Sequence, residues 1–247
     1  MHKTVDVQQP FSLERHISYP LMLFLLVAAI FEYFQFDLNI AQYFFSLEGG
    51  VDSWPLRGQW LSENVLHTGG RNLVIVLGTA LLISLGLSCK SKRWNQYRRN
   101  LLCLTLSVLT SILLVKFAKE FTHVSCPWDV IQFGGQFAYV PIFSPLPNGA
   151  EFGQCFPGGH SSGGYAWVAL YYFALQLKPK LRWYGLAFGI LLGATFSLTQ
   201  QLRGAHFFSH GLWSLAISWF TASSYYYFLF VRAKKQNRLE TPEMTSH

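Results

Sequence analysis

The sequence predicts an all-α polytopic membrane protein, a bundle of six transmembrane helices. Hydrophobic residues make up 51% of its 247 residues and charged residues only 13%, which is too apolar for an ordinary soluble domain. A helix needs roughly 20 residues to cross about 30 Å of hydrocarbon, and most of the apolar blocks approach this length. The six blocks lie near residues 19–36, 73–88, 101–117, 165–177, 184–202 and 212–231.

The first and fourth blocks need separate consideration. Residues 1–15 contain Asp6 and Glu14, and no small-residue cleavage site follows the first block, so we expect a retained signal anchor. The fourth block is short, and it spans the membrane only if its helix begins near Ser161. We therefore expect one membrane domain over residues 1–234 and a polar cytoplasmic tail over residues 235–247.

Positive charges gather on one side of this six-span alternation. The net charge is +7, but its placement indicates contact with anionic lipid headgroups and argues against a nucleic-acid partner. The positive-inside rule places both termini in the cytoplasm, and we expect a bacterial inner membrane. The basic residues of the cytoplasmic side are Lys3, Arg15, Lys90, Lys92, Arg93, Arg98, Arg99, Lys178, Lys180, Arg182, Arg232, Lys234, Lys235 and Arg238.

The connections on the opposite, extracytoplasmic face are the place to look for function. Residues 37–71 and 121–160 are rich in glycine and proline, so both are predicted to be irregular loops with a short interfacial helix. A short turn near residues 203–210 emerges on the same face. The loop of residues 121–160 is the predicted extracytoplasmic active-site loop.

Five ionisable residues lie at these ends of the helices: Lys119, His160, Arg203, His206 and His210. Ionisable groups at a membrane are costly unless they face the bundle interior or a wet cavity, so we expect them to converge on one pocket. If residues 203–210 are helical, their spacings of three and four place Arg203, His206 and His210 on one helix face.

The run Pro157-Gly-Gly-His160-Ser161-Ser162 precedes an apolar block, and Ser161 or Ser162 is expected to cap the helix that follows. A helix start presents free backbone N–H groups, which suit phosphate. Phosphoester cleavage needs cations, a nucleophile and an acid for the leaving group. Histidine fills the last two roles near neutral pH.

The spacing of these residues resembles the type 2 phosphatidic acid phosphatase superfamily, whose pattern is Lys-x6-Arg-Pro, then Pro-Ser-Gly-His, then Ser-Arg-x5-His-x3-Asp. The first motif corresponds to Lys119-x6-Cys126-Pro127, with cysteine in place of arginine, and the second to Pro157-Gly158-Gly159-His160, with glycine in place of serine. In the third, Gly204-Ala205-His206 fits, Thr199-Gln200 replace Ser-Arg, and His210 takes the place of aspartate. The resemblance covers roughly residues 119–210.

The resemblance implies roles for the matching residues. His206 would be the nucleophile that becomes phosphorylated, His160 the acid that protonates the leaving oxygen, and His210 the group that orients His206. Lys119 would bind phosphate, with Arg203 compensating in part for the two missing arginines. Gly159 and Ser161, at the helix start of the second motif, complete the predicted substrate-binding set.

We therefore expect a membrane lipid phosphatase that removes a terminal phosphate from an amphiphilic phosphate ester or diphosphate through a phosphohistidine intermediate, without a cofactor. Phosphatidylglycerophosphate, polyprenyl phosphates or diphosphates, lipid A and phosphatidate are all candidate substrates. The alternatives are a lipid phosphotransferase and an inert lipid-binding or translocating protein. His206 and His210 could also be plain interfacial histidines or, as His-x3-His, zinc ligands, but no carboxylate lies close in sequence and we expect no metal.

The cysteines divide into two pairs. Cys126 and Cys155 lie in the same extracytoplasmic loop, next to the first and second motifs, in a compartment that oxidises thiols. We expect a disulfide between them, with two free thiols as the alternative. Cys89 and Cys103 lie toward the cytoplasmic ends of their helices, where free thiols are expected.

Overall fold

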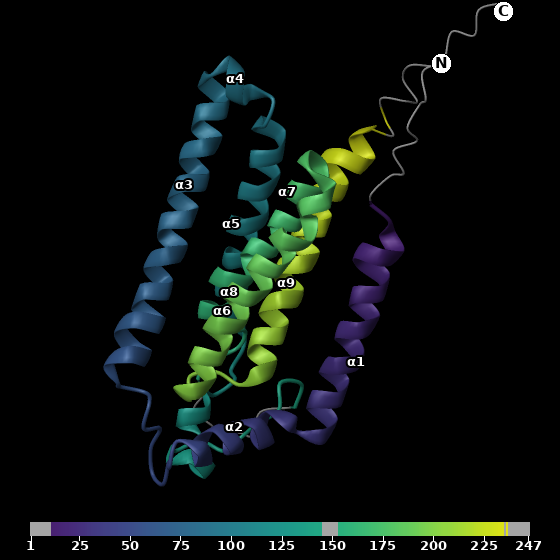
Figure 1. The fold of residues 1–247 in the computed structure, drawn as a ribbon. Helices are drawn as coiled ribbons and strands as arrows, with labels where there is room; N and C mark the ends of the chain where they lie inside the picture. Colours follow the sequence, from purple (N-terminus) through teal and green to yellow (C-terminus); the bar gives the residue numbers. More distant parts are fainter. Residues whose placement is uncertain (1–10, 145–152, 235, 237–247) are drawn as a thin grey trace, which may run out of the picture.

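The computed structural model describes residues 11–144, 153–234 and 236. These residues form helices with irregular connections, and one isolated β-bridge joins Val130 to Phe137. Most of the long helices run side by side in an elongated bundle, and α2 lies across one end of it (Figure 1). The all-α prediction is confirmed.

The first apolar block forms η1 (Glu14–Ser18) and α1 (Tyr19–Phe34), and a second helix, α2 (Phe36–Leu47), follows at once. Gln35 separates α1 from α2, with a left-handed φ of 51° that turns the chain. This elbow lays α2 across the end of the bundle (Figure 1), where the sequence predicted a loop with a short helix.

The second and third blocks form η2 (Leu61–Gly69) with α3 (Gly70–Lys90), the short α4 (Lys92–Asn95), and α5 (Arg98–Phe121). The prediction of an irregular loop up to residue 71 is wrong for residues 61–69. These residues form a helical extension of α3 whose polar composition, including Glu63, Asn64 and His67, conceals it from a hydropathy pattern. At its start the Ser62 hydroxyl donates to the carbonyls of Leu56 and Gln59.

The described part of the loop after α5 contains η3 (Pro127–Asp129) and η4 (Ile131–Phe133). These turns pack against α2 and the connection that follows it, in an apolar cluster at the end of the bundle. The cluster contains Ala41, Phe45, Trp54, Val130, Phe133 and Phe207. It ties the N-terminal part of the chain to the turn before α9.

The fourth block is one continuous helical run of α6 (Gly159–Tyr165), η5 (Ala166–Ala169) and α7 (Leu170–Leu177), followed by η6 (Pro179–Leu181) and α8 (Arg182–Leu202). Gly185, Gly189 and Gly193 form a stripe on α8 against this run. A Cβ atom on Gly189 would lie 2.3 Å from the backbone nitrogen of Val168, and one on Gly193 would lie 2.1 Å from the ring of Tyr165. Small residues at this spacing let the backbones approach closely.

The sixth block forms α9 (Phe208–Tyr226) and η7 (Tyr227–Arg232). Its buried face carries small polar residues, and Ser214, Ser218 and Ser223 return their hydroxyl hydrogen bonds to carbonyls one turn earlier. This pattern satisfies hydroxyl groups inside an apolar bundle without a separate partner.

Four helical stretches among the described residues are long and apolar enough to cross a membrane: Glu14–Phe34, Leu61–Lys90, Arg98–Phe121 and Pro179–Leu202. The chain is an integral membrane protein. The fourth and sixth blocks are helical but do not reach that threshold, so the count of six spans stays a prediction. The predicted tail, residues 235–247, lies outside the described residues except for residue 236.

Candidate active site

A tight turn at the end of α8 sets the position of His206. α8 ends at Leu202 with Arg203 as its C-cap, and Gly204, with a left-handed φ of 66°, follows directly. The backbone N–H groups of Ala205 and His206 both donate to the carbonyl of Gln200, at 2.8 and 3.3 Å. Residues 203–207 are therefore a turn, and the helix face expected to carry Arg203, His206 and His210 does not form.

The turn nevertheless brings two imidazoles together. The Nδ1 atoms of His206 and His210 lie 3.2 Å apart in a hydrogen bond, with His210 in the first turn of α9. Both side chains are buried. Burial lowers the pKa of His206 well below its ordinary value, and the neighbouring His210 and Lys119 lower it further. His206 is therefore neutral at pH 7, as a nucleophile must be.

Cys155, one half of a disulfide, lies beside the imidazole rings of His206 and His210. The backbone carbonyl of Cys155 lies within hydrogen-bonding reach of His206 and His210. Cys155 is joined to Cys126 by a disulfide with Cα atoms 5.3 Å apart, and its N–H donates to the carbonyl of Val124 at 3.0 Å. The bridge thus fixes an acceptor beside the imidazole pair.

A group of metal-type ligands also includes this disulfide. Ligand atoms of Cys126, Asp129 and Cys155 lie within 4.8 Å of one another. The bonded sulfurs carry no thiolate, which is the form that binds metal, so the group does not fit a metal centre. The other cysteines, Cys89 and Cys103, are free thiols.

Lys119 reaches the start of α6. A Cβ atom placed on Gly159 would lie 3.6 Å from the Nζ of Lys119, so the ammonium lies against the glycine backbone. The N–H of Gly158 donates to the carbonyl of His210 at 3.0 Å, and the Gly158 carbonyl accepts from the Ser214 hydroxyl at 2.9 Å. These bonds dock the second motif onto the first turns of α9.

The expected helix cap is wrong. Gly158 is the N-cap of α6, because the helix begins at Gly159, three residues earlier than a cap at Ser161 would allow. Ser161 is fully buried, and its hydroxyl has no hydrogen-bond partner among the described residues. A Cβ on Gly158 would lie 2.6 Å from that hydroxyl, so a side chain at position 158 would require the Ser161 hydroxyl to move.

His160 and Arg203 lie on the side of the site that faces η2. The ring centroid of His160 is 4.9 Å from that of His67 and 4.6 Å from that of Phe196. The guanidinium of Arg203 forms an ion pair with Glu63 and donates to the side chain of Gln200 at 3.2 Å. Gln200 occupies the position at which the family pattern has arginine. Because Arg203 bonds to Gln200, its positive charge lies close to the place where that arginine would be.

Sequence reasoning missed three residues near the site: Asp37, Glu63 and His67. The Asp37 carboxylate accepts hydrogen bonds from the N–H of Ser209, at 2.9 Å, and from its hydroxyl, capping α9 from another helix. Burial raises the pKa of Asp37 to about 6, against the opposing effect of these bonds. All three lie far from the motifs in sequence, and no local pattern pointed to them.

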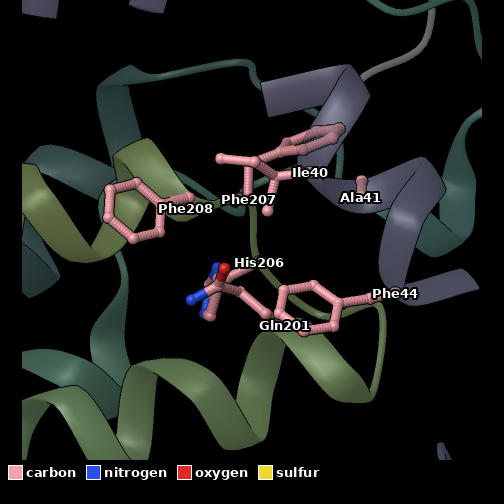
Figure 2. Close-up of a pocket in the computed structure, with 7 residues that line it drawn as sticks. All are labelled: Ile40, Ala41, Phe44, Gln201, His206, Phe207 and Phe208. Atoms are coloured by element: carbon pink, nitrogen blue, oxygen red, sulfur yellow. The ribbon is translucent and has the colours of Figure 1, made fainter. Parts of the chain in front are cut away.

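His206 also faces α2. Figure 2 shows it in a small pocket with Gln201 and Phe208, against Ile40 and Ala41 of α2. The pocket leaves no room for a water molecule. On this side, therefore, α2 shields His206 from solvent.

A sequence model of the PAP2 superfamily matches residues 100–234, more than half of the chain, and spans Lys119, His160, His206 and His210. The chain belongs to the PAP2 superfamily. This confirms the family predicted from the motifs. No curated protein matches the chain. Among solved structures, this PAP2 superfamily protein is similar to the first transmembrane PAP2 type phosphatidylglycerolphosphate phosphatase from Bacillus subtilis, at 20% identity and a TM-score of 0.48, covering 88% of this chain and 94% of that one.

Proposed function

We propose that this PAP2 superfamily protein is a metal-independent lipid phosphatase that works through a phosphohistidine on His206. The hydrogen bond between the Nδ1 atoms of His206 and His210 carries the proposal, because it leaves the Nε2 of a neutral His206 as the attacking atom. His206 is also electrostatically coupled to Lys119 and His160, which supply the cation and the acid.

In the first step, the lone pair of His206 Nε2 attacks the terminal phosphorus. The bond from phosphorus to the leaving oxygen breaks, and that oxygen takes its electron pair and a proton from His160. His210 accepts the hydrogen bond from His206 Nδ1–H as the nucleophile becomes positive. A neutral imidazole supports this charge less strongly than the family's aspartate would.

In the second step, a water oxygen attacks phosphorus and the bond from phosphorus to His206 breaks. The nitrogen regains its lone pair, and the water proton passes to His160, which returns to its starting form. Lys119 and the backbone at Gly159 would hold the phosphoryl oxygens in both steps. Arg203 would add a second positive charge, reduced by its pairing with Glu63.

The substrate would be an amphiphilic phosphate ester or diphosphate in the outer leaflet of a bacterial inner membrane, reached by a six-span bundle with cytoplasmic termini. Support comes from the apolar helices and from the basic residues on one side of the alternation. A cysteine introduced at Gln132, in a Cys89→Ser background whose remaining free thiol, Cys103, is buried, should react with an impermeant reagent added outside intact cells. Reaction only after lysis would overturn this orientation.

The activity test uses full-length protein purified in detergent with phosphatidate, phosphatidylglycerophosphate, a polyprenyl diphosphate and lipid A. We expect release of inorganic phosphate from at least one of them, unchanged by EDTA because no step needs a metal. Transfer of phosphate to a lipid acceptor instead of water would favour the phosphotransferase alternative. Absence of any turnover would overturn the enzyme proposal in favour of an inert lipid-binding protein.

A further inference from the structure

Glu63 and His67 form a carboxylate–imidazole pair beside the site, outside the residues matched by the family. Both come from η2 and lie four residues apart, with Nδ1 of His67 3.2 Å from Oε1 of Glu63. The second oxygen of Glu63 pairs with Arg203. The side chains of Glu63 and His67 are 40% and 32% exposed, so water reaches the pair.

This pair adjoins the predicted acid. The ring of His67 lies 4.9 Å from that of His160, centroid to centroid, and Phe196 covers His160 at 4.6 Å. The Nε2 of His160 is buried and has no hydrogen-bond partner among the described residues. A Cβ on Gly70 would lie 3.2 Å from that nitrogen, so the glycine leaves space for the ring. His67 is thus the polar side chain packed against the acid.

Burial is the main factor that disfavours the protonated form of His160. A positive charge on His67, on Arg203 of the α8–α9 turn or on Arg71 of α3 adds to this effect, whereas a hydrogen bond to the Leu66 carbonyl favours the protonated form. Lys119 lies against the neighbouring glycine. An acid must nevertheless hold a proton when substrate binds. Among the described residues, Glu63 is the carboxylate whose contacts, to His67 and Arg203, face this group of cations.

We propose that Glu63 acts through His67 to keep His160 protonated, so that both are positioning residues for the acid. With Nδ1–H of His67 donated to Glu63, His67 is neutral, and the lone pair on its other nitrogen can accept a hydrogen bond from protonated His160. The negative charge of Glu63 offsets the arginines and favours a positive His160. The inference rests on the proposed phosphatase function.

The test is the pH profile of kcat/KM, from about pH 3 to 9, for phosphate release from short-chain phosphatidate by the full-length protein. Wild-type activity should fall at high pH as the acid loses its proton. In Glu63→Gln and His67→Phe this fall should move about one pH unit lower, the ordinary effect of losing a nearby opposite charge. The drop in kcat/KM should reach roughly tenfold at pH values well above the pKa of the acid and should vanish at pH values well below it. Glu63→Asp should shift less than Glu63→Gln.

Two further comparisons separate the relay through His67 from other causes. Because Glu63 acts through His67, the double variant should shift no further than either single variant. Asn64→Ala, an exposed neighbour on η2, should keep the wild-type profile. If His67→Phe does not fold, as judged by its unfolding temperature, His67→Gln takes its place.

An equal loss of activity at every pH would mean that the pair is merely structural and would overturn the inference. An unchanged profile in both variants would overturn it as well. If the wild-type protein releases no phosphate from any lipid of the panel, the proposed function itself fails and the inference fails with it. Active wild-type protein with unaltered variants removes the inference alone.

Discussion

The two parts of the chain contribute differently to the site. The family-matched part, residues 100–234, supplies the ammonium and imidazole groups: Lys119, His160, His206 and His210. The described residues before it supply Asp37 and Glu63, the carboxylates that contact the site or its helices. The groups of the proposed reaction therefore lie in the motifs, while their charge balance and placement depend on a region that the motifs do not describe.

The two carboxylates also differ from each other. Asp37 is 5% exposed and holds the first turn of α9 through Ser209. Glu63 is half-exposed and divides its oxygens between Arg203 and His67. A buried carboxylate bound to backbone acts mainly on stability, whereas one beside cations at the site acts on reactivity. Mutations in each part should therefore give different signatures.

The largest effects should come from the matched part. His206→Ala and His160→Ala should each lower kcat about 10³-fold or more, because they remove the proposed nucleophile and the proposed acid. His123→Ala, in the loop that follows the first motif lysine, should have a much smaller effect. Phosphate release by variants of unchanged unfolding temperature is the measurement. Wild-type activity in His206→Ala would contradict the proposed mechanism. It would also contradict the contrast between residues 100–234 and the residues before them.

Removal of the disulfide should cost stability throughout the site. Cys126 and Cys155 are separated by 29 residues, and closing such a loop stabilises a protein by roughly 3–4 kcal/mol in the chain-entropy model. Cys126→Ser and Cys155→Ser should be equally destabilised, and the double variant should lose nothing further. Unfolding with and without reductant tests this. Additive losses would mean that the cysteines act separately.

Arg203 belongs to the family-matched part and pairs with Glu63 of the part before it. Its substitution should have an intermediate effect on kcat/KM. Arg203→Gln should lower kcat/KM about 10²-fold, because it removes a cation beside the position of a missing family arginine. Arg182→Gln, at the opposite end of α8, is a control, since the Arg182 guanidinium lies 5.3 Å from the Trp183 ring centroid. Equal losses in both variants would show that the effect of Arg203 is not specific to the site. Steady-state kinetics on the preferred lipid distinguish the two outcomes.

Asp37 should give the smallest effect, on stability and its pH dependence. Asp37→Ala should cost about 1 kcal/mol by removing the cap of α9. Folding raises the pKa of Asp37 from its ordinary value of 3.8 to about 6, so the ionised side chain disfavours the folded state. The wild type should therefore lose stability relative to Asp37→Asn as pH rises from about 4 to 6. A constant difference over that range would contradict the assignment.

The sequence alone could predict features that depend on a local pattern, namely apolar helices and family motifs. The apolar blocks became helices, and the family followed from Lys119, His160 and the approach to His206. The helical extension over residues 61–69 could not be found from hydropathy, because its residues are polar. The prediction of a cap at Ser161 or Ser162 is wrong because the helix already begins at Gly159, with Gly158 as its N-cap.

The long-range pairs escaped for a different reason. Asp37 meets Ser209 and Glu63 meets Arg203 across separations of 172 and 140 residues. Such contacts depend on the orientation of α2 after the elbow at Gln35 and of α9 after the turn that follows α8. One sequence carries no local sign of a pairing that only the assembled fold creates.

The elbow at Gln35 has a consequence for engineering. A non-glycine residue in the left-handed region costs about 1–2 kcal/mol, and glycine would adopt the same φ of 51° freely. Gln35→Gly should thus relax the backbone locally. It would also release the orientation of α2, whose Asp37 and Ile40 lie within two turns of the elbow. The side chain at position 35 therefore strains the backbone locally, but it narrows the range of directions in which α2 can leave α1.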